Sequence, residues 1–274
     1  MNYYQICACA KDEQPYIKDW FEWHRNLGFN VFHIADNGGN GNPLFGMNFY
    51  DYKDKQAIQI PFYQTITDWL SIGDWCLFCD IDEFLNIDCG AIDKFIAQIP
   101  NNIDCVLFNW KCYGDNGLDN YEDKPVWERF KTPAPIDCVY NSDLTGHITE
   151  NFHVKALVRK TNKRIIWNNV HCPIIENGVY CDSSFKQVNP HFWKQINWDN
   201  GYIAHYITKS KEEFCKRRLD KDRDATGRLH NKRKSNKILH ELKWAFSNMK
   251  NGGQLRPPFC YFSFNLSFIQ LKSV

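Results

Sequence analysis

The run WCLFCDIDEFL, residues 75–85, joins a short apolar segment directly to a group of carboxylates. Five apolar residues bounded by polar ones predict a buried β-strand at residues 75–79. In an extended segment, residues two positions apart point the same way, so we expect Asp80 and Asp82 to face a common point. Two carboxylates at this spacing can bind one hard cation, with water and phosphate oxygens as the other ligands. The run therefore predicts a Mg²⁺ or Mn²⁺ site at Asp80 and Asp82.

The rest of the first 110 residues alternates between strand-like and helix-like patterns. Compact apolar runs predict strands at residues 4–10, 30–35, 57–61 and 104–110. A helix is expected after Pro15, because apolar side chains recur at spacings of three and four until Gly28. A second helix is expected at residues 91–99. Strands that alternate with helices indicate an α/β fold with a mainly parallel sheet flanked by helices.

Ligands of such sheets bind beyond the carboxyl ends of the strands. Asp36, Asp80 and Asp82 each follow a predicted strand, so we expect all three at one edge of the sheet.

The second half of the chain is less regular. It contains short predicted strands at residues 153–159 and 164–167, and predicted helices at 211–219 and 235–248, before an aromatic-rich tail at 259–271. We divide the chain into a domain at residues 1–208 and a basic helical and aromatic extension at residues 209–274.

Charge and composition restrict the partners. The whole chain of 274 residues has a net charge of +1, which argues against a general nucleic-acid binder. Residues 209–237 nevertheless carry 12 Lys/Arg against 5 Asp/Glu, a local net charge of +7. Such a segment suggests peripheral association with an anionic membrane surface, and a solvated helix face is the alternative.

Twelve cysteines at irregular intervals suggest neither a disulfide framework nor a metal cluster. The first residues lack the apolar core of a signal peptide, so we expect a cytoplasmic protein with free, mostly buried thiols. Cys76 and Cys79 form a lone C-x-x-C without the second pair of a zinc site. No run approaches the 18 apolar residues of a membrane span.

Several short motifs together resemble a family. They are Lys11-Asp12-Glu13, the helix pattern Trp20, Trp23, His24 and Gly28, the pair Asp36-Asn37, the run Asp80-Ile81-Asp82-Glu83-Phe84-Leu85, and His205-Tyr206 with Lys209-Ser210. In these the chain resembles the bacterial family 2-like and family 92-like glycosyltransferases, over roughly residues 3–216. The resemblance implies a GT-A fold and an inverting mechanism. The chain departs from the pattern in three places: Asp12 replaces the usual Asn, the loop 38–43 lacks a second acidic residue, and residues 62–74 leave little room for a longer helix expected there.

The resemblance also implies roles for individual residues. Asp36 would contact the nucleoside, and Lys11 would line its pocket unless it is simply an exposed charge. Asp80 would contribute to both donor and metal binding. His205 is a candidate third metal ligand, because a neutral imidazole binds Mn²⁺, and Lys209 could reach the diphosphate. His171 competes with His205 for the metal, and a structural role for His205 remains the alternative.

An inverting transferase needs a base that deprotonates the acceptor hydroxyl. Asp115 lies in a loop just past the strand predicted at residues 104–110, on the expected side of the sheet. Glu150 and Glu176 are alternatives, and no motif decides among the three.

These observations favour a glycosyltransferase that moves a hexose from a UDP-sugar to a glycan or glycolipid acceptor, as in lipopolysaccharide or capsule biosynthesis. Two other functions stay open. Phosphatases of the haloacid-dehalogenase type also use D-x-D, but theirs follows the first strand and continues in the form D-x-D-x-[TV], which the run with Glu83 here does not match. A non-catalytic carbohydrate-binding protein would use the many aromatic residues. Binding of UDP that requires Mn²⁺ separates the first function from both others.

Overall fold

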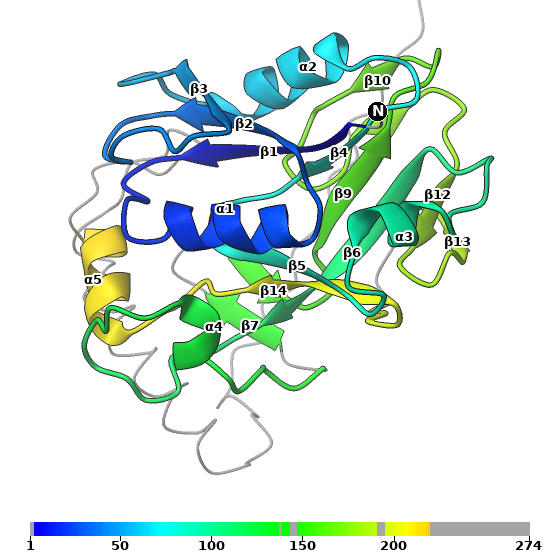
Figure 1. Ribbon diagram of the computed structural model, residues 1–274. Helices are drawn as coiled ribbons and strands as arrows, with labels where there is room; N and C mark the ends of the chain where they lie inside the picture. The colour runs from blue at the N-terminus through cyan, green and yellow to red at the C-terminus, as the bar shows by residue number, and fades with distance from the viewer. Residues whose placement is uncertain (1–2, 137–138, 143–146, 191–194, 220–274) are drawn as a thin grey trace, which may run out of the picture.

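The computed structural model describes residues 3–136, 139–142, 147–190 and 195–219. Its centre is a mixed sheet in the order β13-β12-β6-β9-β4-β1-β2-β3, to which β14 and β5 are joined beside β6 (Figure 1). The strands of this sheet are β1 (Tyr4–Ala10), β2 (Val31–Asp36), β3 (Met47–Asp51), β4 (Trp75–Phe78), β5 (Glu83–Ile87), β6 (Cys105–Cys112), β9 (Val154–Arg159), β12 (Tyr180–Asp182), β13 (Gln187–Val188) and β14 (Gly201–His205).

Five helices and two hairpins complete the described chain. The helices are α1 (Ile17–Asn26), α2 (Gln59–Trp69), α3 (Ile92–Ile96), α4 (Val126–Arg129) and α5 (Lys211–Leu219). The hairpins pair β7 (Val139–Ser142) with β8 (His147–Glu150), and β10 (Ile165–Ile166) with β11 (Ile174–Ile175). None of these helices is long and apolar enough to cross a membrane.

The predicted α/β class with a largely parallel sheet is confirmed. Strands β3, β2, β1 and β4 are parallel neighbours. Strand β9 interrupts the parallel order, because it runs antiparallel to both β4 and β6. As a result β4 and β6 point the same way, and their carboxyl ends lie at the same edge of the sheet.

Helices α1 and α2 cover opposite faces of the parallel half (Figure 1). Neighbouring residues of β1 show this division. Ile6 and Ala8 belong to the apolar cluster on the α1 side, and Cys7 between them belongs to the cluster on the α2 side. Since successive side chains of a strand point to opposite faces, β1 must be apolar along its whole length. This explains why residues 4–10 were recognisable as a strand.

The strand predicted at residues 57–61 is wrong, because this segment begins helix α2. Buried Ile58, Phe62, Ile66 and Leu70 recur every four residues, which is helical spacing. Pro61 is the third residue of the helix, where a backbone N–H has no partner within the helix and its absence costs little. We had expected too little room for a longer helix before the D-x-D run, but α2 (Gln59–Trp69) occupies this position.

The true third strand is β3, an edge strand with a single fully buried side chain, Met47. An edge strand that buries so little has no apolar pattern to identify it, and the sequence did not predict it.

Helix α1 is hydrogen-bonded to strand β5, which directly follows the acidic run. The indole N–H groups of Trp20 and Trp23 donate to the carbonyls of Glu83 and Leu85, at 3.0 and 2.8 Å. His24 Nε2 accepts the Leu85 N–H at 3.2 Å, while Nδ1 lies 2.9 Å from the Trp20 carbonyl and donates to it. The three motif residues of α1 therefore hold the acidic run in place.

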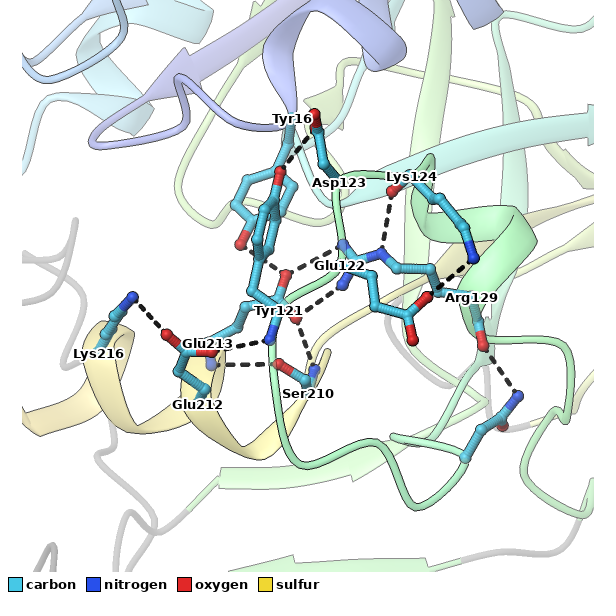
Figure 2. Close-up of polar contacts among 11 residues, drawn as sticks. Tyr16, Tyr121, Glu122, Asp123, Lys124, Arg129, Ser210, Glu212, Glu213 and Lys216 are labelled. Carbon is cyan, nitrogen blue, oxygen red and sulfur yellow. Dashed lines mark hydrogen bonds and ion pairs between the residues drawn. The ribbon is translucent and has the colours of Figure 1, made fainter.

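Helix α5 begins with a capping box. The Ser210 N–H donates to Glu213 Oε2 at 2.9 Å, and the Glu213 N–H donates back to Ser210 Oγ at 3.3 Å. Glu213 also makes a two-pronged ion pair with Arg129 at the end of α4 and accepts the Tyr16 hydroxyl (Figure 2). The start of α5 is thus bound to both α1 and α4, and the boundary after residue 208 stays a prediction. The helix predicted at 235–248, the aromatic tail and most of the basic segment lie outside the described residues.

We expect stability to depend on pH through His24. Burial lowers the pKa of His24 to about 3, whereas the unfolded imidazole titrates near its ordinary 6.5. Between these values the unfolded chain binds more protons, so the free energy of unfolding must fall as pH drops below about 6.5. From pH 7.5 to pH 5 this residue should account for about 2 kcal/mol. The free energy of unfolding in urea should be measured for wild type and His24→Phe at pH 7.5 and pH 5. The difference between the two proteins should be smaller at pH 5 by about 2 kcal/mol. An unchanged difference would mean that His24 is not held neutral in the folded protein.

Candidate active site

The acidic run is a tight turn rather than an extended segment. The Glu83 N–H donates to the Asp80 carbonyl at 3.1 Å, which closes a β-turn from Asp80 to Glu83. The extended geometry from which we expected Asp80 and Asp82 to face a common point is therefore replaced by a turn, and a shared metal site at the two residues stays a prediction. The two carboxylates have different partners on different strands.

Asp80 is paired with a lysine from β9. Its Oδ2 lies 2.8 Å from Lys155 Nζ, and its Oδ1 accepts a hydrogen bond from Gln59 Nε2 at 2.6 Å. The Asp80 side chain is 35% exposed, whereas that of Lys155 is 0% exposed. Both carboxylate oxygens of Asp80 therefore have a partner within the protein.

Glu83 shares the same lysine. Its Oε2 lies 3.3 Å from Lys155 Nζ and accepts the Asp80 N–H at 2.8 Å, while Oε1 has no hydrogen-bond partner among the described residues. Burial raises the pKa of Glu83 to about 8, although Lys155 acts in the opposite direction. Burial alone would lower the pKa of Lys155, but Asp80 and Glu83 outweigh it and raise that pKa. Lys155 is therefore an ammonium ion inside the protein.

Asp82 is buried on the other side of the turn, with 3% exposure. His205 Nε2 lies 3.7 Å from Asp82 Oδ1, and Lys209 Nζ lies 3.9 Å from Oδ2. Strand β14 brings His205 there, since its register places His205 opposite Glu83, and the Tyr206 N–H donates to the Asp82 carbonyl at 2.9 Å. Lys209 has a left-handed backbone, with φ of +53°, immediately before the cap of α5.

Asp82 and His205 fit two ligands of one divalent ion. Two atoms each about 2.1 Å from an ion can be at most about 4.2 Å apart, and the observed separation of 3.7 Å satisfies this. No group of three His, Cys, Asp or Glu side chains suited to a metal occurs among the described residues. A metal at this place would therefore take its other ligands from water and from phosphate oxygens.

His205 and its competitor His171 meet at the same tryptophan. Their ring centres lie 4.2 and 5.3 Å from that of Trp110, and His153 stacks on Trp110 at 4.8 Å. The His171 Nδ1–H donates to the Val154 carbonyl at 3.2 Å, which leaves Nε2 as the acceptor nitrogen. Burial and the neighbouring Lys155 lower the pKa of His171 to about 3, so this imidazole is neutral. Both histidines predicted from the sequence are thus part of one cluster.

Asp36 and Lys11 follow β2 and β1 at the edge that carries the acidic turn. Asp36 Oδ1 accepts hydrogen bonds from the Gly38 N–H and the Asn40 side chain, which orders the loop after β2. Lys11 is half-buried just past β1. Asp12, where Asn was expected, has φ of +56°, a conformation that Asp and Asn both tolerate.

The three candidate bases are separated by the fold. Asp115 lies just past β6 at the edge of the acidic turn, where its Oδ1 accepts the Gly117 N–H at 3.0 Å. Glu150 is the last residue of β8. The next residue, Asn151, accepts the Cys112 N–H at the end of β6 with its Oδ1, so the backbone of Glu150 lies near that strand end. The Glu150 side chain is outside the described part of the chain. Glu176 is exposed, and its N–H donates to the Arg164 carbonyl. Glu176 precedes β12, whose first residue pairs with the first residue of β6, so it lies at the opposite edge.

A large hollow adjoins the site through Lys209. Its volume is about 1060 Å³, and it extends between the start of α1, the loop around Asn40, the segment around Tyr121 and the start of α5. Lys209 Nζ lies over the Tyr16 ring, 4.3 Å from its centre. Lys209 therefore lines this hollow and also lies close to Asp82.

Lys155, Gln59 and Trp110 were not predicted as site residues. Lys155 stands in the run Val154-Lys155-Ala156-Leu157-Val158, where a single charge looks like a solvent-facing position of a strand. The feature of the sequence that could have identified Lys155 as a site residue was its position as a single charge among four apolar residues.

We expect Arg129 to stabilise the segment that carries Lys209. The Arg129 side chain is fully buried against Glu213, at 2.8 Å. Burial acts to raise the pKa of Glu213, but hydrogen bonds from Arg129 and Ser210 lower it below its usual value. Arg129→Met would leave this carboxylate buried without a cation and should cost about 3–5 kcal/mol in denaturant unfolding. Adding Glu213→Gln should restore at least half of the loss, and a double variant no better than the single one would contradict this explanation.

Comparison with known proteins does not place the chain in a family. No protein-family model matches the sequence, and no curated protein matches it significantly.

Proposed function

We propose that the chain is a metal-dependent, inverting glycosyltransferase of the GT-A type, which transfers a hexose from a UDP-sugar to a glycan or glycolipid acceptor. The observation that carries the proposal is the convergence of Asp82, His205 and Lys209 at the carboxyl edge of the sheet. This is where α/β sheets bind their ligands. The motifs that resemble glycosyltransferases supply these same residues.

Asp82 and His205 would hold the divalent ion, which supplies Lewis-acid neutralisation of the charge on the leaving diphosphate. Lys209, whose Nζ lies 3.9 Å from Asp82 Oδ2, is placed to contact a phosphate oxygen. Lys11 and Asp36, one and two strands away along the same edge, are assigned to the nucleoside. The donor then extends along the ends of β2, β1 and β4.

The base belongs on the β6 side of the acidic turn, and the acceptor belongs in the hollow beside Lys209. Asp115 and Glu150 are the two candidates near the end of β6, and Glu176 is no longer proposed because it lies at the far edge. The hollow beside Lys209 has tyrosines, amides and charged groups in its wall, which suit the hydroxyl groups and ring faces of a glycan. We assign the acceptor to this hollow.

A donor panel tests the proposal and separates it from its alternatives. UDP-, GDP- and CMP-sugars should be compared for hydrolysis with and without Mn²⁺, with a simple phosphate monoester beside them. We expect release of UDP that requires Mn²⁺. Hydrolysis of the monoester alone would indicate a phosphatase, and sugar binding without any turnover would indicate a carbohydrate-binding protein.

The first variant to test is Asp82→Asn. Loss of this carboxylate should lower kcat for Mn²⁺-dependent donor hydrolysis by roughly 10²–10³, because an electrostatic contribution to the transition state is removed. Circular dichroism should show an intact fold. Asp93→Asn, an equivalent change at an exposed carboxylate on α3, is the matched control and should have no effect. Normal activity of Asp82→Asn would remove this residue from the site.

The two histidines can be distinguished by metal rescue. His205→Ala should weaken Mn²⁺ binding, and excess Mn²⁺ should partly restore the rate of donor hydrolysis. His171→Ala should instead lower the melting temperature, with no response to added Mn²⁺. The opposite pattern, in which Mn²⁺ rescues only His171→Ala, would assign the metal to His171.

A further inference from the structure

Tyr121 is an exposed aromatic side chain in the wall of the large hollow. Among the exposed large hydrophobic side chains of the described residues, Tyr121, at 36% exposure, is the one that lines the hollow. It lies in the segment between β6 and α4, beside the start of α5 (Figure 2). An aromatic ring that meets solvent within a concave wall is suited to contact with a ligand.

The backbone around Tyr121 is fixed to the first turn of α5. The Lys211 N–H donates to the Leu118 carbonyl at 3.1 Å. The Glu212 N–H donates to the Asp119 carbonyl at 2.9 Å, and Glu212 Oε2 accepts the Tyr121 N–H at 2.8 Å. These bonds use only the backbone of the segment and the side chain of Glu212. They are therefore available to any residue that replaces Tyr121, except proline.

The ring of Tyr121 is itself held in place. The guanidinium carbon of Arg129 lies 5.2 Å from the ring centre, and the Arg129 side chain is fully buried. The Tyr121 hydroxyl donates to Asp123 Oδ1 at 3.3 Å. Because Arg129 is buried, the exposed surface of the ring lies away from it. A ring held in this way loses little conformational freedom when a ligand packs against it.

The same arginine connects Tyr121 to Lys209. Glu213 accepts hydrogen bonds from both Arg129 and the Tyr16 hydroxyl (Figure 2). Lys209 Nζ in turn lies 4.3 Å from the centre of the Tyr16 ring. The two tyrosines and Lys209 line one hollow, so a ligand on Tyr121 occupies the same space that Lys209 borders.

The charge on the wall of the hollow is nearly balanced. Its lining includes four lysines and five acidic residues, and one of the acidic residues, Glu213, is paired with the buried Arg129. A wall of this kind offers no excess of cations to an anionic sugar. It therefore favours an uncharged one.

Building on the acceptor site of the proposed function, we propose that Tyr121 is the residue that recognises the acceptor, with an uncharged pyranose of the acceptor stacked on its ring. The C–H groups of one sugar face pack against the ring, while the hydroxyl groups reach the polar side chains of the wall. Tyr121 then determines which acceptor binds.

Saccharide binding tests this inference without any need for turnover. Dissociation constants are measured by saturation-transfer-difference NMR on the full chain with UDP and Mn²⁺, using lactose, maltose, cellobiose and chitobiose as probes. At least one probe should bind, and Tyr121→Ala should weaken its binding by at least about fivefold. Tyr121→Leu should weaken it as much, because leucine still covers Arg129 but offers no flat ring. Tyr121→Phe, which loses only the hydroxyl, should stay within about twofold of wild type.

Two controls complete the experiment. Tyr3→Ala removes a tyrosine that is 51% exposed just before β1, at the opposite edge of the sheet, and should bind like wild type. Methyl glucoside should bind at least as tightly as methyl glucuronide, its anionic counterpart. Circular dichroism establishes that each variant folds, and if Tyr121→Ala does not fold, Tyr121→Leu decides.

The outcomes separate this inference from the proposed function. Wild type that binds no probe, or equal binding by wild type and folded Tyr121→Leu, overturns the role of Tyr121. Tighter binding of the glucuronide overturns the uncharged acceptor. Release of UDP that requires Mn²⁺ would leave the transferase intact in each of these cases. Saccharide binding that depends on Tyr121, in a protein that hydrolyses no nucleotide-sugar, would overturn the transferase and keep the saccharide site.

Discussion

The buried ammonium of Lys155 is the interaction on which the arrangement of the site depends. Three carboxylates occur within four residues, directly after a strand that is buried on both faces. Buried carboxylates must be compensated, and the local sequence offers no cation. Strand β9 provides one for Asp80 and Glu83, and the segment after β14 places Lys209 beside Asp82. The antiparallel insertion of β9 between β4 and β6 is what brings Lys155 to the turn.

Two anchors hold the acidic turn and Lys209 in place. On one side, the indoles and the imidazole of α1 bond to the backbone of β5, and Trp20, Trp23 and His24 leave little freedom to the strand that follows the turn. On the other side, the pair of Arg129 and Glu213 fastens the start of α5. Lys209, which immediately precedes the capping Ser210, is thereby held in a left-handed conformation and close to Asp82. Residues far from the proposed metal site thus determine where its charged side chains lie.

The site combines a closely paired group with a more widely spaced one. Asp80, Glu83 and Lys155 are paired at 2.8 and 3.3 Å. Asp82, His205 and Lys209 are separated by distances that an ion or a phosphate oxygen could bridge, and Lys209 lines the large hollow. This division suits a site that must keep its shape while a charged donor enters and a diphosphate leaves. The cluster of histidines around Trp110 borders both groups, and its member His171 is a neutral imidazole.

The sequence alone predicted the elements whose buried residues form a recognisable apolar pattern along the chain. Strands β1 and β4 are apolar on both faces, helix α1 repeats its apolar residues every three or four positions, and α5 carries its own capping box, so each was recognisable locally. Edge strand β3 and the start of α2 were missed, because the first buries one side chain and the second resembles a short strand around Pro61. The identities of Asp80, Asp82, His205 and Lys209 as site residues also came from local motifs. Only the tertiary structure decided that the acidic run forms a turn, that Lys155 pairs with Asp80, and that Glu176 lies at the opposite edge. The last two outcomes depend on pairing between residues that are 75 positions apart, Lys155 with Asp80 and Tyr180 with Cys105, and the pattern of one segment does not reveal its distant partner.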